Sequence, residues 1–74
     1  MNEEITMTII ELRPLPGGRW RVFESPGVEP VFPDREGALS YAESRMRARS
    51  GEIRIFDLAA SVTEIIPFRE RTRL

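Results

Sequence analysis

A single helix, preceded by Asp34, is the feature that most constrains this chain. Leu39, Ala42 and Met46 recur at helical spacing, and Ala38 lies beside them in the same apolar stripe. Asp34 follows a proline, and its carboxylate can accept hydrogen bonds from the open amides of a first helical turn. The segments on either side have the short apolar patterns of strands. The pattern therefore predicts an α+β fold in which one helix packs on a sheet.

The helix is expected to run from Asp34 to about Ser50. Gly51 then suits the left-handed residue that ends many helices. Three arginines close to that end favour the negative pole of the helix dipole. The expected helix therefore has a defined signal at both ends.

Five segments are predicted to be strands of an antiparallel sheet, in the chain order β-β-β-α-β-β. The segments are residues 5–13, 19–24, 28–32, 52–57 and 62–68. Pro30 cannot donate to a ladder, so the third strand is expected at an edge or only partly paired. We expect one domain over residues 1–74, with flexible termini at 1–4 and 69–74.

The first strand carries two apolar phases. Ile5, Met7 and Ile9 alternate with polar residues, which indicates one buried face. Ile10 and Leu12 then shift the apolar phase by one residue. Either a bulge or a strand buried on both faces accounts for this shift, and the sequence leaves both open.

A core follows from these patterns. We expect it to contain Ile9, Trp20, Val22, Phe32, Leu39, Ala42, Met46, Ile53, Ile55 and Ile66. Phe23, Ile10 and Phe56 fall on the opposite phase, where an apolar patch would indicate an interface. Trp20 is interpreted as core rather than as an interface anchor.

The composition argues against most catalytic chemistry. Among the 74 residues there is no cysteine and no histidine, and every basic residue is arginine. Disulfides, thiolate nucleophiles, tetrahedral zinc sites and imidazole acid–base catalysis are therefore excluded. The serines have no histidine or lysine to activate them. We expect no enzyme activity, no catalytic residues, no metal and no cofactor.

The charge balance gives no strong field toward nucleic acid or membrane. The net charge is −1 and the isoelectric point is about 5.4. No apolar run reaches the roughly 18 residues that span a membrane. The first four residues are acidic rather than basic, so no signal peptide is expected and the cytoplasm is the expected compartment.

Nucleic-acid binding is one of two functions that the sequence leaves open. Arg19, Arg21 and Phe23 share one face of the second strand, and Arg54 extends that face. Arginines beside an aromatic ring can contact phosphates and stack on bases. The basic tail at 69–74 could add a flexible arm. Four glutamates lie in or beside the same strands, however: Glu11, Glu24, Glu29 and Glu52. The favoured interpretation is a solvated face with cross-strand arginine–glutamate pairs.

Self-association is the other function, and the sequence favours it. A chain of this length buries only about 60% of its unfolded surface, so a partner would help to stabilise it. An open five-stranded sheet also has two edges and one uncovered face. We therefore expect a non-catalytic interaction module that self-associates through a sheet edge or face, with weak nucleic-acid binding as the alternative.

The core pattern resembles a family of short bacterial proteins of unknown function. The matching motifs are Trp20-Arg21-Val22, Phe32, Asp34-Arg35-Glu36-Gly37-Ala38-Leu39 with Ala42, and Ile53-Arg54-Ile55-Phe56. The resemblance covers about residues 19–66 and implies a strand, a capped helix and a final hairpin. The sequence departs from the pattern at residues 57–61, which lack the expected glycine. The family implies no catalytic residues.

The first half is also similar to the N-terminal arm-binding domain of tyrosine recombinases. That domain has a three-stranded sheet with a Trp-x-Val strand, then a phenylalanine and a helix. The resemblance implies a DNA-reading sheet face, with Arg19 and Arg21 at the matching positions. The two strands expected after the helix, and the glutamates, depart from it.

Overall fold

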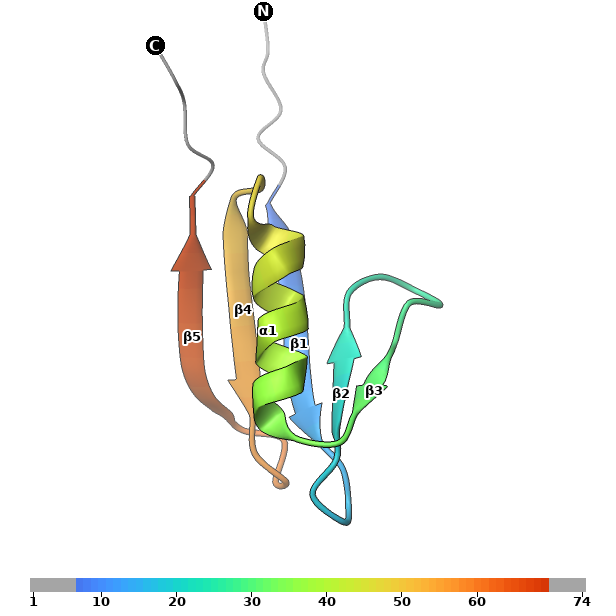
Figure 1. The fold of residues 1–74 in the computed structure, drawn as a ribbon. Helices are drawn as coiled ribbons and strands as arrows, with labels where there is room; N and C mark the ends of the chain where they lie inside the picture. The colour runs from blue at the N-terminus through green and yellow to red at the C-terminus, as the bar shows by residue number, and fades with distance from the viewer. Residues whose placement is uncertain (1–6, 70–74) are drawn as a thin grey trace, which may run out of the picture.

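The computed structural model describes residues 7–69, which form a five-stranded sheet with one helix on one face (Figure 1). The elements are β1 (Thr8–Pro14), β2 (Trp20–Phe23), β3 (Val31–Phe32), α1 (Arg35–Met46), β4 (Gly51–Phe56) and β5 (Val62–Phe68). The α+β class, the five strands and their chain order are therefore confirmed. Of the termini expected to be flexible, only residue 69 is described; residues 1–4 and 70–74 lie outside.

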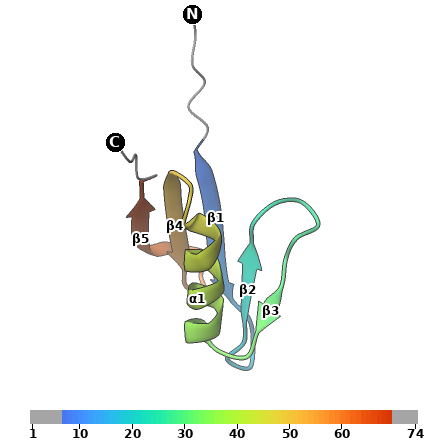
Figure 2. The ribbon, with the colours of Figure 1, turned by 45° about the horizontal axis from the view of Figure 1, so that its top comes forward.

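The sheet is mixed, so the prediction of an antiparallel sheet is wrong. Its order is β3-β2-β1-β4-β5, and the central β1–β4 pair is parallel while the other three pairs are antiparallel. The reason lies in the connections. β1, β2 and β3 form an up-and-down meander, and α1 then returns the chain to the end at which β1 begins (Figures 1 and 2). β4 therefore runs in the direction of β1, and pairing beside it is necessarily parallel.

Asp34 caps α1 as predicted. Its backbone is extended, and its Oδ1 accepts a hydrogen bond from the Gly37 amide at 2.8 Å. The helix ends at Met46, four residues earlier than expected, because the Arg49 amide turns back to the Met46 carbonyl at 3.0 Å. Among the residues 7–69, α1 is the one helix, and no helix there is long and apolar enough to cross a membrane.

Gly51 begins β4 rather than ending the helix. It has a φ of +156°, and a Cβ added there would lie 1.8 Å from the Thr8 carbonyl oxygen. β4 therefore starts so close to β1 that only glycine fits. The prediction that Gly51 ends the helix is therefore wrong, because the helix ends at Met46 and the glycine is required by strand packing.

The core lies between α1 and the sheet. Its fully buried members are Ile10, Leu12, Val22, Ala38, Ala42, Met46, Ile53 and Ile55. Trp20, Phe32, Leu39 and Ile66 are partly buried and pack against it. The prediction that Ile9 belongs to the core is wrong, since Ile9 is 39% exposed and Ile10 takes that place. For the same reason Ile10 does not belong to an exposed patch.

β1 contains no bulge and is not buried on both faces, so neither explanation proposed for its two apolar phases is correct. Its register with both neighbours is regular, so it contains no bulge. Ile10 and Leu12 point toward α1, and Met7 and Ile9 point away from it with 57% and 39% exposure. The earlier phase therefore belongs to the uncovered face. Ile5 lies outside the described residues.

The strand ends follow from local chemistry. β3 has only two residues and lies at a sheet edge, as expected from Pro30. In the β4–β5 turn, Asp57 Oδ1 accepts from the amides of Ala59 and Ser61, both at 2.9 Å. Ala60 adopts a φ of +65°, the left-handed conformation for which a glycine was expected.

Candidate functional site

The sheet face opposite α1 is the candidate functional site, and we refer to it as the open face. It is defined by the side chains that alternate with the core residues along each strand. Its members are Ile9, Glu11 and Arg13 of β1, Arg21 and Phe23 of β2, Val31 of β3, Glu52, Arg54 and Phe56 of β4, and Ile65 and Pro67 of β5. No described helix covers this face (Figures 1 and 2).

Ion pairs on the open face run along the strands rather than across them. Arg13 binds Glu11 two residues away, with 2.9 Å between Nη2 and Oε1. Arg54 binds Glu52 in the same way on β4. The expected arginine–glutamate pairing is therefore present, but the expectation that it crosses between strands is wrong. Such half-exposed pairs contribute at most about 1 kcal/mol each.

Arg13 also covers an aromatic ring. Its guanidinium carbon lies 3.9 Å from the centroid of Phe56 and 5.9 Å from that of Phe23. This cation–π contact leaves Phe56 only 8% exposed, although no helix lies over it. The predicted apolar patch is therefore reduced: Phe56 is covered by Arg13, while Phe23 remains half-buried at the surface.

The four residues proposed for nucleic-acid contact are only partly brought together. Arg21, Phe23 and Arg54 lie on the open face, whereas Arg19 is exposed in the loop that precedes β2. The Arg54 guanidinium is already paired with Glu52. The Nε of Arg21 is buried from solvent and has no hydrogen-bond partner. Of the basic tail, only residue 69 is described.

A hollow of about 560 Å³ lies on the open face beside β2. Ile9, Phe23 and Pro26 supply its apolar walls, and Glu11 and Arg54 lie along its side toward β4. The segment after β2 closes the other side. A hollow with apolar walls and a charged rim of both signs suits a protein side chain better than a phosphate.

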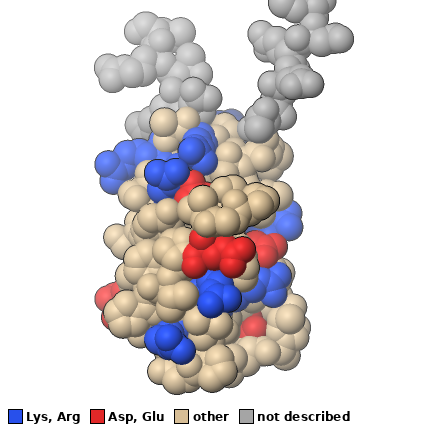
Figure 3. Space-filling view, turned by 90° about the vertical axis from the view of Figure 1, so that its right-hand side faces the viewer, with Lys and Arg blue, Asp and Glu red and all other residues tan. Residues whose placement is uncertain are grey.

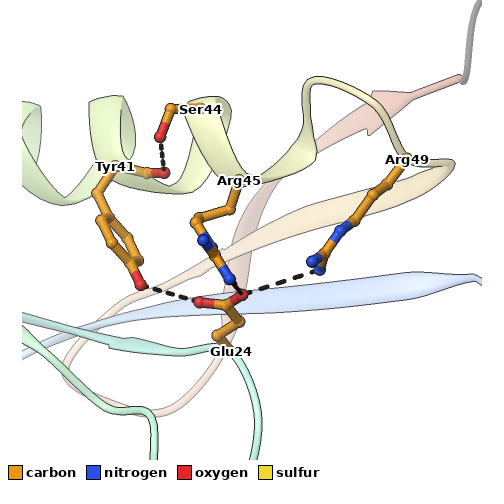
Figure 4. A network of polar contacts seen from close by, with 5 residues as sticks. All are labelled: Glu24, Tyr41, Ser44, Arg45 and Arg49. Carbon is orange, nitrogen blue, oxygen red and sulfur yellow. Dashed lines mark hydrogen bonds and ion pairs between the residues drawn. The ribbon is translucent and has the colours of Figure 1, made fainter.

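Glu24 is a residue that the sequence argument missed. It was grouped with the solvated glutamates, but its side chain is only 6% exposed and faces α1. Glu24 Oε1 accepts from the Tyr41 hydroxyl at 2.9 Å, and Oε2 accepts from Arg45 Nε at 2.8 Å, with Arg49 Nη1 at 3.8 Å (Figure 4). The strand alternation with buried Val22 was the signal that could have found it.

The surroundings of Glu24 shift its titration. The hydrogen bond from Arg45 lowers the pKa of Glu24 below its usual 4.5, and this outweighs the opposing effect of burial. Its hydrogen bond to the same carboxylate raises the pKa of Tyr41. All three partners lie on or just after α1, so this cluster ties the end of β2 to the helix and is a structural clamp.

The charges do not form a single-sign surface. On the side of the molecule that carries the β3 edge, acidic and basic side chains alternate among neutral ones (Figure 3). Within residues 7–69, no group of carboxylates is placed to hold a metal ion. The strong positive field typical of a nucleic-acid interface is therefore missing from this side.

Comparison of the chain with protein-family models, with curated proteins and with solved structures found no match. The resemblances to the bacterial family of unknown function and to the recombinase arm-binding domain stay predictions.

Proposed function

We propose that this chain is a non-catalytic interaction module that binds a second copy of itself through the open face. One observation carries the proposal: a five-stranded sheet has its helix on one face only, and the other face exposes apolar side chains among paired charges. Ile9 and Ile65 are 39% and 51% exposed there.

The edge of the sheet at β5 is a poor site for association. The Thr8 amide donates to the Ser50 carbonyl, so even-numbered residues of β4 bond to β1 and odd-numbered residues bond to β5. Ile65 and Pro67 of β5 therefore turn their backbone groups outward. Pro67 has no N–H to offer, and the register shift beside Phe56 interrupts the ladder at the other end of β5.

The opposite edge is equally short of backbone donors. β3 has two residues, and prolines at positions 30 and 33 flank it. The Val22 amide donates to the Pro30 carbonyl, so Pro30 turns its backbone toward β2, whereas Pro33 falls on the outward phase and offers no N–H to an added strand. Of the two routes expected from the sequence, edge or face, the face is therefore the one we propose.

Mass in solution tests the proposal. Sedimentation equilibrium from low to high micromolar concentration is expected to show a species of twice the 8.5 kDa chain mass. Ile65→Asp, on the open face, is expected to shift the equilibrium toward monomer. Leu58→Asp is the matched control, because Leu58 is 76% exposed in the β4–β5 turn, away from that face. A chain that stays monomeric throughout this range contradicts the proposal.

Weak nucleic-acid binding is the second candidate, and one observation favours it. Arg21, which shares its face of β2 with Phe23, has an unpartnered Nε, and Arg19 is exposed in the loop before β2. The Glu11 and Glu52 carboxylates among the arginines oppose it. Fluorescence anisotropy of labelled duplex DNA and single-stranded RNA at two salt concentrations separates the candidates. Salt-sensitive binding that Arg19→Ala/Arg21→Ala removes would favour this second function.

A further inference from the structure

The residues of the open face form cross-strand rows, and the central row has a symmetry of its own. The registers align Phe23 of β2 with Glu11 of β1, Glu11 with Arg54 of β4, and Arg54 with Ile65 of β5. Across the four strands the row therefore reads apolar, acidic, basic, apolar. Read from the other end, the row has the same apolar flanks, but the two charges exchange places.

This pattern complements itself under one particular rotation. A twofold axis that lies in the interface along the strands, between β1 and β4, places β1 of one copy over β4 of the other. We propose that two copies pack their open faces about this axis, so that Glu11 of each chain faces the partner's Arg54. This inference rests on the proposed self-association and specifies its geometry and the residues that carry it.

The neighbouring row supports the same axis. Arg13 of β1 lies beside Phe56 of β4, with the guanidinium carbon 3.9 Å from the ring centroid. The rotation places Arg13 of β1 opposite the partner's Phe56, so this row also sets a cation against an aromatic ring across the interface. Face-packed sheets cross at about 30°, which displaces side chains little near the axis, and both rows straddle it.

The flanks of the central row complement each other in shape. The rotation places Ile65 over the partner's Phe23. Ile65 stands 51% exposed on β5, and the hollow of about 560 Å³ beside Phe23 has apolar walls. Each copy therefore offers one projecting aliphatic side chain and one hollow that can receive it, at positions that the twofold axis exchanges. Burial of such an anchor in a pocket is how interfaces gain most of their binding energy.

The other twofold axis in the interface plane gives a poorer match. An axis perpendicular to the strands places Glu11 over the partner's Glu11 and Arg54 over the partner's Arg54, which opposes like charges. Charge complementarity therefore selects the axis along the strands. The two arrangements make opposite predictions for mixtures of charge-reversed chains.

Charge reversal with mixing tests the geometry. Glu11→Arg alone places two arginines opposite each other twice in a homodimer, and Arg54→Glu alone does the same with glutamates. Each variant alone is expected to dimerise roughly tenfold more weakly than the wild type. In a mixture of the two variants both contacts pair opposite charges again, so a 1:1 heterodimer is expected at close to the wild-type affinity. Far-UV circular dichroism of each variant alone checks that it is folded.

The remaining outcomes separate this inference from the proposed function. A monomeric wild type overturns both. A wild-type dimer whose two single variants remain monomeric when mixed overturns the geometry alone. If Glu11→Arg instead pairs with the wild-type chain, the perpendicular axis is correct. If neither substitution changes the dimer, the contact lies away from the open face. Mass photometry is unsuited to so small a chain, so native mass spectrometry with one chain isotope-labelled is the readout.

Discussion

The two faces of this sheet are built from the same strands, yet their side chains differ in burial and in polar pairing. On the face beneath α1, the central strand side chains, such as Ile10, Val22 and Ile53, are fully buried. The Glu24 side chain there is 6% exposed, and both of its carboxylate oxygens have partners. On the open face, charged and apolar side chains alternate, and the apolar ones remain 39–51% exposed at Ile9 and Ile65. The first face stabilises the fold, whereas the second exposes apolar side chains that could contact a partner.

Polar groups show the same difference. The Glu24 cluster joins a strand to the helix, with each contact between elements distant in sequence. The open-face pairs join residues two apart on one strand, so they link no elements together. Within residues 7–69, the buried side-chain nitrogen that lacks a partner also lies on the open face, at Arg21. Substitutions on the two faces should therefore differ in kind as well as in size.

The largest difference is expected between two adjacent isoleucines. Ile10→Ala removes a fully buried side chain beneath α1 and should cost about 2–5 kcal/mol of unfolding free energy. Ile9→Ala changes a side chain that is 39% exposed on the open face and should cost less than about 1 kcal/mol. Urea unfolding of dilute samples, where the chain is monomeric, makes the measurement. Equal losses at the two positions would break the distinction between the faces.

This pair also shows where sequence reasoning succeeded and failed. The helix, its Asp34 cap and the edge position of β3 could be predicted because each depends on local chemistry. The phase of β1 could not, because two apolar registers overlap at Ile9 and Ile10 and only packing against α1 selects one. The parallel β1–β4 pair was within reach of the sequence: an up-and-down meander followed by a returning helix leaves no antiparallel position at either edge.

The site was less predictable than the fold. Alternation along the strands was enough to place Arg21, Phe23 and Arg54 on one face. It did not show that Arg54 pairs with Glu52 on its own strand, nor that Arg13 covers Phe56. Those contacts depend on rotamers and on which strands are neighbours, and the order β2-β1-β4 became clear only from the structure.

The second prediction compares two carboxylates that both bind arginine. At pH 7, Glu24→Gln should cost about 1–2 kcal/mol, because it replaces charged hydrogen bonds at a side chain that is only 6% exposed. Because the folded pKa of Glu24 is lowered, its contribution is present above its usual 4.5 and is lost as the pH falls through the lowered value. The gap between wild type and variant should therefore close in acid.

Glu64→Gln is the matched control. Glu64 binds Arg35 at 2.9 Å, but both side chains are about half exposed, so its loss should cost less than about 0.5 kcal/mol. Urea titrations from neutral to acidic pH measure both variants. If the two variants behave alike across the range, the Glu24 cluster does not stabilise the helix-covered face.

The third prediction concerns Arg13, whose guanidinium covers the ring of Phe56 on the open face. Arg13→Met removes an ion pair and the cation above Phe56, and should cost about 0.5–1 kcal/mol. Arg54→Met removes the equivalent ion pair, and among the described residues the Arg54 guanidinium lies over no aromatic ring. The stability difference between the two variants, measured by thermal unfolding, reports the contact with Phe56. No difference would mean that the ring gains nothing from the guanidinium.

The smallest effect on stability is expected at Arg21. A substitution there distinguishes a role in folding from a role in binding a partner. Arg21→Met keeps an apolar stem of similar length and removes a buried N–H that has no partner, so stability should stay equal or rise by up to about 1 kcal/mol. A loss larger than that would show that the guanidinium stabilises the single chain. If stability is kept while self-association weakens, Arg21 contributes to contact rather than to folding. Where a native residue serves binding, replacing it can stabilise the fold. That combination of results at Arg21 would identify the open face, rather than the helix-covered face, as the part of the molecule that function constrains.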